Sequence, residues 1–459
     1  MKTFLFTAKL REYLAEGNRK ALREFCASAP PALVAEHLSA LHADEIHRII
    51  ENAQPLTRAE IFSHLDNLIQ VKITELMSRE ELAQLVTDMA PDDRVDLLKQ
   101  LSDEDREALL REVARAERED IRRLSLYPEG TSGAAMTSDY AVLMPGITAR
   151  EAIERLRYEA PDKETIYYAY IVDDQRKLIG FVSLKDLILA KPDKLVSEIM
   201  NRNIIMAQAM DDQEDAAHKI RKYDLIALPV VNEEGALLGI ITHDDAIDII
   251  TQEHTEDMEK LMAIAGSHEA GVYLKTPALV HFKNRAWWIV GLAALGLVSG
   301  LIIHSFENTL MHMMILALYM PMVADTGGNT GSQSATVIVR ALALKEISFG
   351  DIFRILLKEL KISMMLAVVL GVIAWGKVMF LSRGSEIPSG FSLSMIGLTI
   401  AAALGMQVVT ATLIGALLPL CASRLKLDPA VVASPALTTV VDITGLLIYF
   451  SMAKALLGI

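Results

Sequence analysis

A polar, glycine-rich stretch inside an otherwise lipid-compatible run is the feature of this 459-residue sequence with the clearest chemical meaning. At membrane depth every peptide group must find a partner, so polar or irregular chain is tolerated only where protein buries it or where it lines a wet cavity. The stretch, Pro321 to Arg340, is therefore predicted to form the wall of a pore through Asp325, Asn329, Thr330, Ser332, Gln333, Ser334 and Thr336.

A single acidic residue, Asp442, is the second anomaly. It lies near the middle of the apolar segment Val431 to Ile459. A carboxylate at the centre of a membrane helix costs about 2.5 to 3.5 kcal/mol on insertion scales. Two such anomalies in one apolar region indicate one shared site.

A tight helix crossing is the alternative explanation of the polar stretch. Gly327, Gly328 and Gly331 would suit it, because small residues let membrane helices approach closely. By itself, a crossing leaves the acidic and amide side chains of the same stretch unexplained in hydrocarbon.

Charge is divided sharply along the chain. Residues 1–285 hold 35 Lys+Arg and 51 Asp+Glu, a net charge of −16, whereas residues 286–459 hold 10 and 8, a net charge of +2. The polyanionic part argues against nucleic acid as a partner and favours divalent cations, which would offset its self-repulsion. A solvated acidic surface still explains most of these carboxylates.

Two further features restrict the location and chemistry. Cys26 and Cys421 are the only cysteines, so the chain offers neither a disulfide framework nor a Cys-rich metal site. The amino terminus lacks an apolar core of signal-peptide length, and we expect the first half to stay in the cytosol.

Residues 31–123 are predicted to form a superhelical stack of amphipathic helices, because Leu, Ile and Met recur at three- and four-residue spacing. Asp92 and Asp93 fall in the first turn of one such helix, after Pro91. A favourable interaction with the helix dipole explains these two residues about as well as cation binding does. Asp96 lies further along, where this dipole effect fades.

Between residues 131 and 250, short β runs alternate with helices in two copies that can be aligned. Gly180 aligns with Gly239, and Asp186 with Asp245. Each copy is predicted to be a strand, a polar turn, a second strand and a helix capped by Ser183 or Thr242.

This duplicated pattern resembles a tandem pair of CBS domains. The resemblance implies a compact α/β pair that often binds adenine nucleotides such as ATP. Ser183 and Asp186 in the first copy, and Thr242 and Asp245 in the second, stand where relatives contact ribose and phosphate. The same residue types also cap helices for structural reasons.

A long acidic helix is predicted to follow the second copy, with carboxylates at helical spacings. Mg²⁺ prefers oxygen ligands and keeps some of its water, so one or two carboxylates per ion are enough. We hypothesise that Mg²⁺ bound by these carboxylates and by those near Pro91 draws the domains together and closes the pore. The predicted ligands are Asp92, Asp93, Asp96, Asp245, Asp248, Glu253, Glu256 and Asp257.

The remaining chain is predicted to span the membrane five times. Basic residues gather in the connections on one side, which places that side in the cytosol and the carboxyl terminus outside. The predicted spans are residues 286–304, about 309–341, about 363–381, about 393–420 and 429 to about 457.

The whole chain resembles the MgtE family of Mg²⁺ channels. The most specific matches are Gly327-Gly-Asn-Thr-Gly-Ser-Gln333 and the segment around Asp442. The resemblance implies a homodimer in the cell inner membrane, with one pore between the subunits. Asp442 would be the ion-selecting carboxylate, with Asn329, Gln333 and Thr336 lining the same path.

The expected fold is multidomain, and the expected protein is a transporter rather than an enzyme. Its predicted parts are an all-α superhelical N domain at 1–130, the CBS pair at 131–250, a connecting helix at 251–282 and an all-α five-helix transmembrane domain at 283–459. An intramembrane metalloprotease would need His-Glu-x-x-His, and the sequence at His268 lacks the second His. The alternatives kept open are transport of another divalent cation, such as Co²⁺ or Mn²⁺, and a nucleotide-sensing membrane protein.

Overall fold

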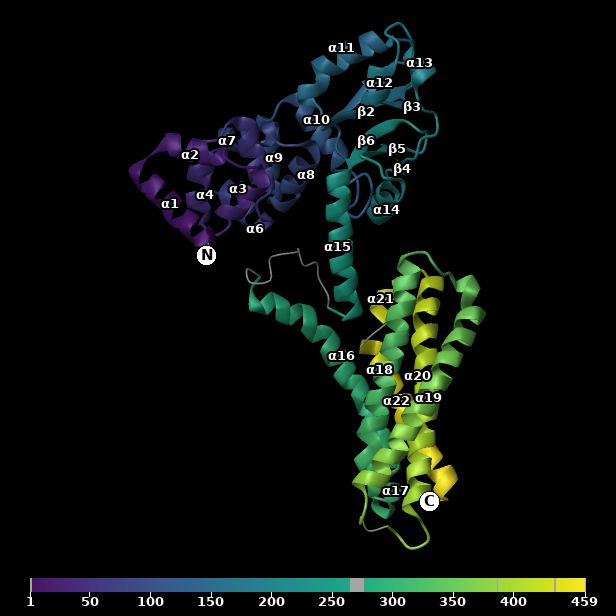
Figure 1. The fold of residues 1–459 in the computed structure, drawn as a ribbon. Coiled ribbons are helices and arrows are strands. Elements are labelled where there is room, and N and C mark those ends of the chain that lie inside the picture. The colour runs from purple at the N-terminus through teal and green to yellow at the C-terminus, as the bar shows by residue number, and fades with distance from the viewer. Residues whose placement is uncertain (1, 265–275, 386, 433–434, 459) are drawn as a thin grey trace. The chain divides into compact units, whose positions relative to one another are not determined.

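The computed structural model describes residues 2–264, 276–385, 387–432 and 435–458. It consists of two compact units, Met1–Thr251 and Gln252–Ile459 (Figure 1).

The first part of unit 1 is entirely helical among the described residues, as predicted. Each helix packs against the next but one, so α3, α5, α7 and α9 form one row and α2, α4, α6, α8 and α10 another. This arrangement is the superhelical stack that the sequence indicates. The helices are α1 (Lys2–Glu16), α2 (Arg19–Cys26), α3 (Pro31–Leu38), α4 (Ala43–Ile50), α5 (Pro55–Ser63), α6 (Asn67–Thr74), α7 (Arg79–Asp88), α8 (Pro91–Gln100), α9 (Asp103–Glu112) and α10 (Arg115–Leu124).

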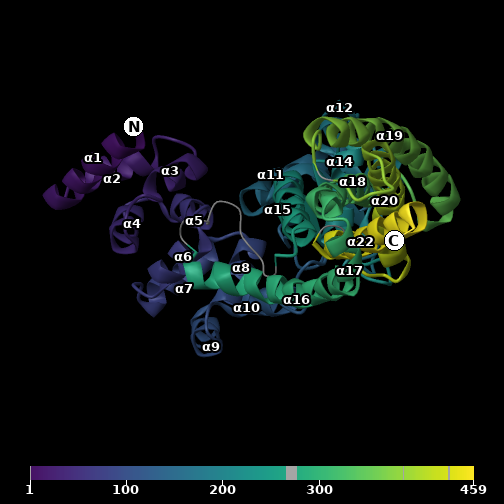
Figure 2. The ribbon, with the colours of Figure 1, turned by 90° about the horizontal axis from the view of Figure 1, so that it is seen from below.

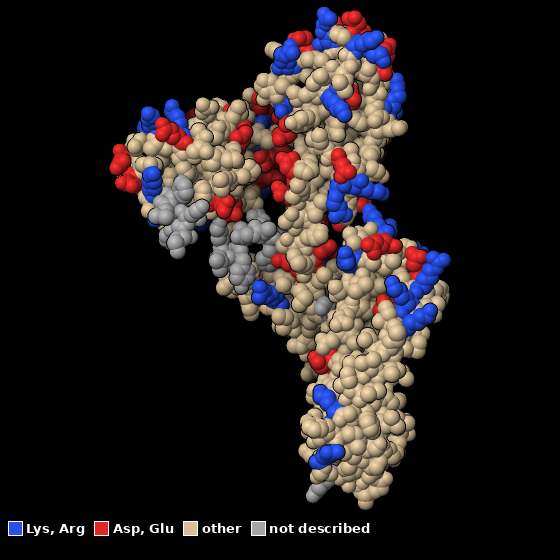
Figure 3. All heavy atoms as spheres, in the orientation of Figure 1, with Lys and Arg blue, Asp and Glu red and all other residues tan. Residues whose placement is uncertain are grey.

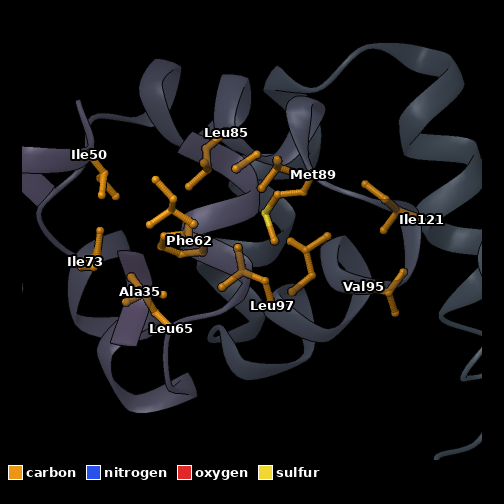
Figure 4. Packing of buried hydrophobic residues seen from close by; sticks show 14 of the residues in the cluster. Ala35, Ile50, Phe62, Leu65, Ile73, Leu85, Met89, Val95, Leu97 and Ile121 are labelled. Carbon is orange, nitrogen blue, oxygen red and sulfur yellow. The ribbon is translucent and has the colours of Figure 1, made fainter. Parts of the chain in front are cut away.

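Local sequence explains where these short helices begin. Pro31, Pro55 and Pro91 each open a helix, where a missing amide hydrogen is tolerated. Ser78 caps α7 by accepting a hydrogen bond from the Glu81 amide. The apolar faces then meet in one continuous core, in which Phe62 is fully buried among neighbours that Figure 4 labels.

The strands form two three-stranded sheets with the same topology, which confirms the duplicated α/β pattern. In each sheet the first strand pairs in parallel with the second, and the second pairs antiparallel with the third. The strands are β1 (Tyr140–Leu143), β2 (Thr165–Val172), β3 (Leu178–Ser183), β4 (Ala207–Gln208), β5 (Ala227–Val231) and β6 (Leu237–Thr242). Their helices are α11 (Ala149–Glu159), the 3-10 helix η1 (Ala160–Asp162), α12 (Leu184–Leu189), α13 (Val196–Ile199) and α14 (Gln213–Tyr223).

The two aligned glycines occupy equivalent places in the two sheets. Gly180 pairs with Ile171 and Gly239 pairs with Val230. A Cβ atom at Gly239 would lie 2.7 Å from the carbonyl oxygen of Thr137, so the close approach of this backbone requires glycine.

The acidic helix is α15 (His243–Leu261), which extends across the predicted limit at residue 250. It begins directly after β6, within the part assigned to the CBS pair. The next described helix, α16 (Ala278–Ser305), begins before residue 283. The predicted connecting part therefore contains the ends of two helices, and its residues 265–275 lie outside the described residues.

Unit 2 is a bundle in which α20 packs against α18, α19 and α22 (Figure 2). After α16, its elements are α17 (Glu307–His312), α18 (Ile315–Ala343), η2 (Phe349–Asp351), α19 (Ile352–Leu381), α20 (Leu393–Arg424), α21 (Pro429–Val432) and α22 (Pro435–Leu457). Figure 3 shows few charged side chains on the lower part of the visible face of this unit.

Among the described residues, four helices are long and apolar enough to cross a membrane: α16, α19 with η2, α20 and α22. The remaining predicted span, the second along the chain, corresponds to α18, which has 29 residues but carries the polar stretch. It packs between α20 and α22, so its polar residues do not all have to face lipid.

The starts of four predicted spans differ from the bounds of the helices. The third span was expected from about Ser363, and α19 starts eleven residues earlier, at Ile352. The second span was expected from about Thr309, but that residue belongs to the short helix α17. The last was expected from Pro429, yet its long helix begins at Pro435, at a position in the first turn that favours proline. The first span was expected from Ala286, and α16 starts eight residues earlier, at Ala278.

Gly415 of α20 lies so close to α18 that a Cβ atom there would collide with the carbonyl oxygen of Gly331. We expect Gly415→Ala to lower the unfolding free energy by about 1–3 kcal/mol through overpacking. The measurement is the thermal unfolding of the full-length protein in detergent.

Gly376→Ala in α19 is the matched control, because nothing lies within 4 Å of the position that its Cβ would take. Equal melting temperatures for the two variants would contradict the close crossing of α18 and α20.

Candidate ion site and acidic clusters

The polar stretch lies within the continuous helix α18, so it contributes side chains rather than irregular backbone. Asp325, Asn329, Gln333 and Thr336 are exposed on the surface of unit 2. Their spacing of four, four and three residues places them on one side of the helix. We call these four residues the polar stripe. Within it, the Asn329 amide donates a hydrogen bond to the Asp325 carboxylate at 3.3 Å.

Two of the residues predicted to line the pore point into the bundle instead. Thr330 is buried and donates to the carbonyl oxygens of its own helix at Thr326 and Gly327. Ser334 is buried and donates to the Glu359 carboxylate of α19 at 2.9 Å. Ser332 is half-buried, beside the stripe. The expectation that all seven polar residues form one wall is therefore wrong for Thr330 and Ser334.

The glycines of α18 lie on the side of the helix that packs against its neighbours. They form the close helix crossing that was considered as an alternative explanation of the polar stretch. Gly327, Gly328 and Gly331 are buried. A Cβ atom at Gly331 would lie 3.1 Å from the carbonyl oxygen of Ala411 in α20. The two explanations thus describe two sides of one helix: glycines against neighbouring helices, and polar side chains outward.

Asp442 of α22 lies near the polar stripe, as the sequence predicts. It is half-buried, and its carboxylate is close enough to that of Asp325 for the two charges to interact. Neighbouring carboxylates repel each other, and a cation or a proton would relieve that repulsion. Asp325, which the sequence places in the predicted pore wall, is thus the residue of the polar stripe whose charge acts on Asp442.

The polar residues of α20 differ in their hydrogen bonds. Gln407 bonds across helices, because its Nε2 donates to the carbonyl oxygen of Val441 at 2.8 Å. Thr410 and Thr412 instead donate to carbonyl oxygens one turn earlier in α20.

Unit 1 contains a cluster of carboxylates that we call the acidic cluster: Asp92, Asp93, Glu164, Asp244 and Asp245. It joins α8 to the start of α15, and Figure 3 shows acidic side chains gathered in this region. Burial raises the pKa of Asp92, and the charges of Asp245 and Asp93 raise it further. The pKa of Glu164 rises to about 7 through burial and the nearby charges of Asp245 and Asp244.

Asp244 and Thr242 have opposite effects on the pKa of Asp245. Burial and the charge of Asp244 raise its pKa to about 6, although the hydroxyl of Thr242 donates a hydrogen bond to its carboxylate. The Oδ1 atom of Asp92 is buried with no hydrogen-bond partner among the described residues. An unpaired buried carboxylate oxygen is costly, and a divalent cation would satisfy it.

The other predicted cation ligands are more accessible. Asp96 pairs with Lys99 at 3.0 Å and has an exposed side chain, so a salt bridge explains it. Asp248 is exposed, and Glu253 is half-buried.

In unit 2, the Lys260 ammonium lies between Glu256, at 2.7 Å, and Asp428, at 2.9 Å. Burial raises the pKa of Asp257, and Asp428 raises it further. We call Glu256, Asp257, Lys260 and Asp428 the α15 end cluster.

The residues predicted to contact nucleotide act as helix caps. Ser183 Oγ donates to Asp186 at 2.6 Å and accepts from the Asp186 amide at 3.0 Å. Thr242 and Asp245 make the equivalent side-chain contact at the start of α15. Helix capping alone accounts for both pairs, and nucleotide binding stays a prediction.

Sequence reasoning missed several acidic residues. Glu164, Asp428 and Glu359 have no acidic neighbour at helical spacing that would have marked them. The fold brings Glu164 and Asp428 to their clusters, and Glu359 to Ser334 of α18. A further group, His47, Glu51 and Glu81, has potential metal-ligand atoms within 4.8 Å of one another. The four-residue spacing of His47 and Glu51 on α4 was its only sequence signal.

Comparisons with known proteins agree with this architecture. The family described as divalent cation transporter, MgtE, matches residues 320–452. The MgtE intracellular N domain matches residues 29–130, and the CBS domain matches residues 133–193 and 196–252.

Among similar proteins, the magnesium transporter MgtE of Thermus thermophilus is 36% identical over 98% of each chain. The magnesium transporter MgtE of Bacillus subtilis is 35% identical over 73% of this chain and 71% of that protein. Relatives named as enzymes, such as the inosine-5'-monophosphate dehydrogenase of Aquifex aeolicus, match only the CBS part, which in that case is 25% of this chain.

Two solved structures are similar to unit 1. The soluble part of a magnesium transporter has a TM-score of 0.52 at 31% identity and covers 55% of this chain and 99% of that one. The cytosolic domain of the Mg²⁺ channel MgtE in complex with ATP has a TM-score of 0.50 at 34% identity and covers 52% and 98%.

The acidic cluster should limit the stability of the chain in metal-free buffer. We expect Asp92→Asn to raise the melting temperature by several degrees in the presence of a chelator, because it removes a buried charge beside Asp245 and Asp93. The measurement is differential scanning fluorimetry of the full chain.

Asp193→Asn is the control for Asp92→Asn, because Asp193 is also acidic but lies exposed in unit 1. A lower melting temperature for Asp92→Asn than for the wild type would show that this carboxylate stabilises the fold without a cation.

Proposed function

The chain belongs to the MgtE family of divalent cation transporters, and from that premise we propose that it is a Mg²⁺ channel gated by Mg²⁺ inside the cell. The observation that carries the proposal is the proximity of Asp442 to Asp325 in the polar stripe. The negative charge of these two carboxylates attracts cations and repels anions.

The ion is proposed to pass in hydrated form. Mg²⁺ gives up its water reluctantly and usually binds proteins through one or two carboxylates. Asp442 would supply the charge, while Asn329, Gln333 and Thr336 would hydrogen-bond to the water shell along α18. Transport of Co²⁺ or Mn²⁺ is the second candidate, because the same oxygen ligands suit Mn²⁺.

A homodimer is the proposed assembly. The polar stripe is exposed on a single chain, yet such side chains are not tolerated against acyl chains. A second copy that presents the same stripe would enclose a polar path between the subunits, and a two-fold interface needs only one self-complementary patch. The proposed topology places the amino terminus in the cytosol and the carboxyl terminus outside.

Regulation is proposed to reside in the acidic cluster and the α15 end cluster. Asp92, Asp93, Asp96, Asp245, Asp248, Glu253, Glu256 and Asp257 remain the proposed ligands. Mg²⁺ bound there would relieve the mutual repulsion of the carboxylates and favour a closed arrangement. The division at residues 130, 250 and 282 stays a proposal, with α15 crossing one of its limits.

ATP is a proposed ligand of the CBS pair, because the related cytosolic domain was solved with ATP. The proposed contacts are Ser183, Asp186, Thr242 and Asp245. Since Asp245 also belongs to the acidic cluster, bound nucleotide and bound cation would influence each other there.

Asp442→Asn keeps the size of the side chain and removes its charge, so we expect Mg²⁺ uptake to fall at least tenfold. The measurement is Mg²⁺-dependent growth and Mg²⁺ uptake in a host that lacks its own Mg²⁺ transporters. Glu346→Gln changes an exposed carboxylate and should behave as wild type. Equal uptake by Asp442→Asn and wild type would remove Asp442 from the ion path.

The combined variant Asp245/Asp248/Glu256/Asp257→Ala tests regulation. We expect its currents to persist at an internal Mg²⁺ concentration that closes the wild-type channel, because the carboxylates that Mg²⁺ would neutralise are gone. The measurement is patch-clamp recording from inside-out membranes with stepped Mg²⁺. Normal closure of the variant would end the gating proposal.

A further inference from the structure

Gln407 is a buried amide at the point where three helices of unit 2 meet. It lies in α20 and its side chain has no exposed surface. Its Nε2 donates to the carbonyl oxygen of Val441 in α22 at 2.8 Å. That carbonyl belongs to the peptide group that joins Val441 to Asp442, so the hydrogen bond holds the backbone at the proposed ion-selecting residue.

Glycines on both neighbouring helices make room for this side chain. A Cβ atom at Gly445 of α22 would lie 2.6 Å from Nε2 of Gln407. A Cβ atom at Gly327 of α18 would lie 2.9 Å from its Cγ. One side chain therefore contacts α18 two residues after Asp325, and α22 on both sides of Asp442.

The amide is costly to keep in this place. Its Oε1 atom is buried and has no hydrogen-bond partner among the described residues. A buried unsatisfied acceptor destabilises the fold, and an apolar side chain of similar volume would avoid that cost. The flipped orientation of the Gln407 amide would be less stable, because Oε1 would then lie against the carbonyl oxygen of Val441 and neither oxygen can donate a hydrogen bond.

We propose that Gln407 is a positioning residue that sets the spacing between the Asp325 and Asp442 carboxylates and thereby the selectivity of the channel. The inference rests on the proposed function. The Gln407 amide donates to Val441 of α22, and its Nε2 and Cγ atoms pack against Gly327 of α18. Mg²⁺ demands nearly ideal octahedral geometry, whereas Ca²⁺ accepts variable geometry. A loosened carboxylate pair should therefore lose Mg²⁺ before it loses Ca²⁺.

Gln407→Met tests the proposal, because methionine is similar in length and volume but cannot donate to Val441. We expect the KM for Mg²⁺ uptake to rise about three- to tenfold, the worth of one buried hydrogen bond. We also expect inhibition by Ca²⁺ at concentrations that leave wild-type uptake unchanged. Uptake is measured in proteoliposomes that hold equal amounts of the full-length protein.

Thr410→Val is the control, because Thr410 lies on the same helix and bonds only to its own backbone at Met406 among the described partners. It should keep the wild-type KM and Ca²⁺ insensitivity. A change in maximal rate or melting temperature alone, with an unchanged KM and unchanged Ca²⁺ sensitivity in Gln407→Met, would show a packing role and overturn the proposal.

Two further comparisons keep the result decisive. If Gln407→Met does not accumulate, Gln407→Asn is measured in its place with the same expectations, and failure of both to accumulate overturns the proposal in favour of packing. Uptake by Asp442→Asn is measured in parallel. Loss of uptake in Asp442→Asn with wild-type selectivity in the Gln407 variant would refute only the positioning role, whereas normal uptake in Asp442→Asn would refute the proposed function itself.

Discussion

Repulsion between neighbouring carboxylates is the constraint that the two units share. In unit 2 the charge of Asp325 in α18 acts on Asp442 in α22. In unit 1 it is the acidic cluster, where burial and like charges raise the pKa of Glu164 to about 7. Each arrangement costs free energy in the chain alone, and each is relieved by a positive charge. A protein that handles a divalent cation has a reason to keep both.

Helix α18 shows how one element meets two conflicting demands. Its outer side has to present polar groups to water, and its inner side has to pack against apolar helices. Glycines at 327, 328 and 331 allow the inner side to approach α20 and α22 closely. Gly327 of α18 and Gly445 of α22 also leave room for the Gln407 side chain, which donates to the carbonyl oxygen of Val441 next to Asp442.

The sequence was sufficient for the features that depend on composition and period. The helical stack, the duplicated strands with Gly180 and Gly239, and the closeness of Asp442 to the polar stretch were all predictable, because each follows from local pattern or from the cost of charge in lipid. The sequence could not assign Thr330 and Ser334 to the inner side of α18, since that depends on how the helix is rotated in the bundle. It also missed Glu164 and Asp428, whose partners lie far away in sequence.

The acidic cluster and the α15 end cluster differ in a way that bears on which of them would respond to Mg²⁺. In the α15 end cluster, Lys260 already pairs with Glu256 and Asp428, so a cation arriving there would have to compete with a bound ammonium. In the acidic cluster, the neighbouring charges that act most strongly on Asp92 and Glu164 are all carboxylates. An unpaired buried charge gains more from a counter-ion than a paired, half-exposed one does. The larger part of any Mg²⁺-dependent stabilisation should therefore arise in unit 1. The ion pairs of the α15 end cluster are present without the metal.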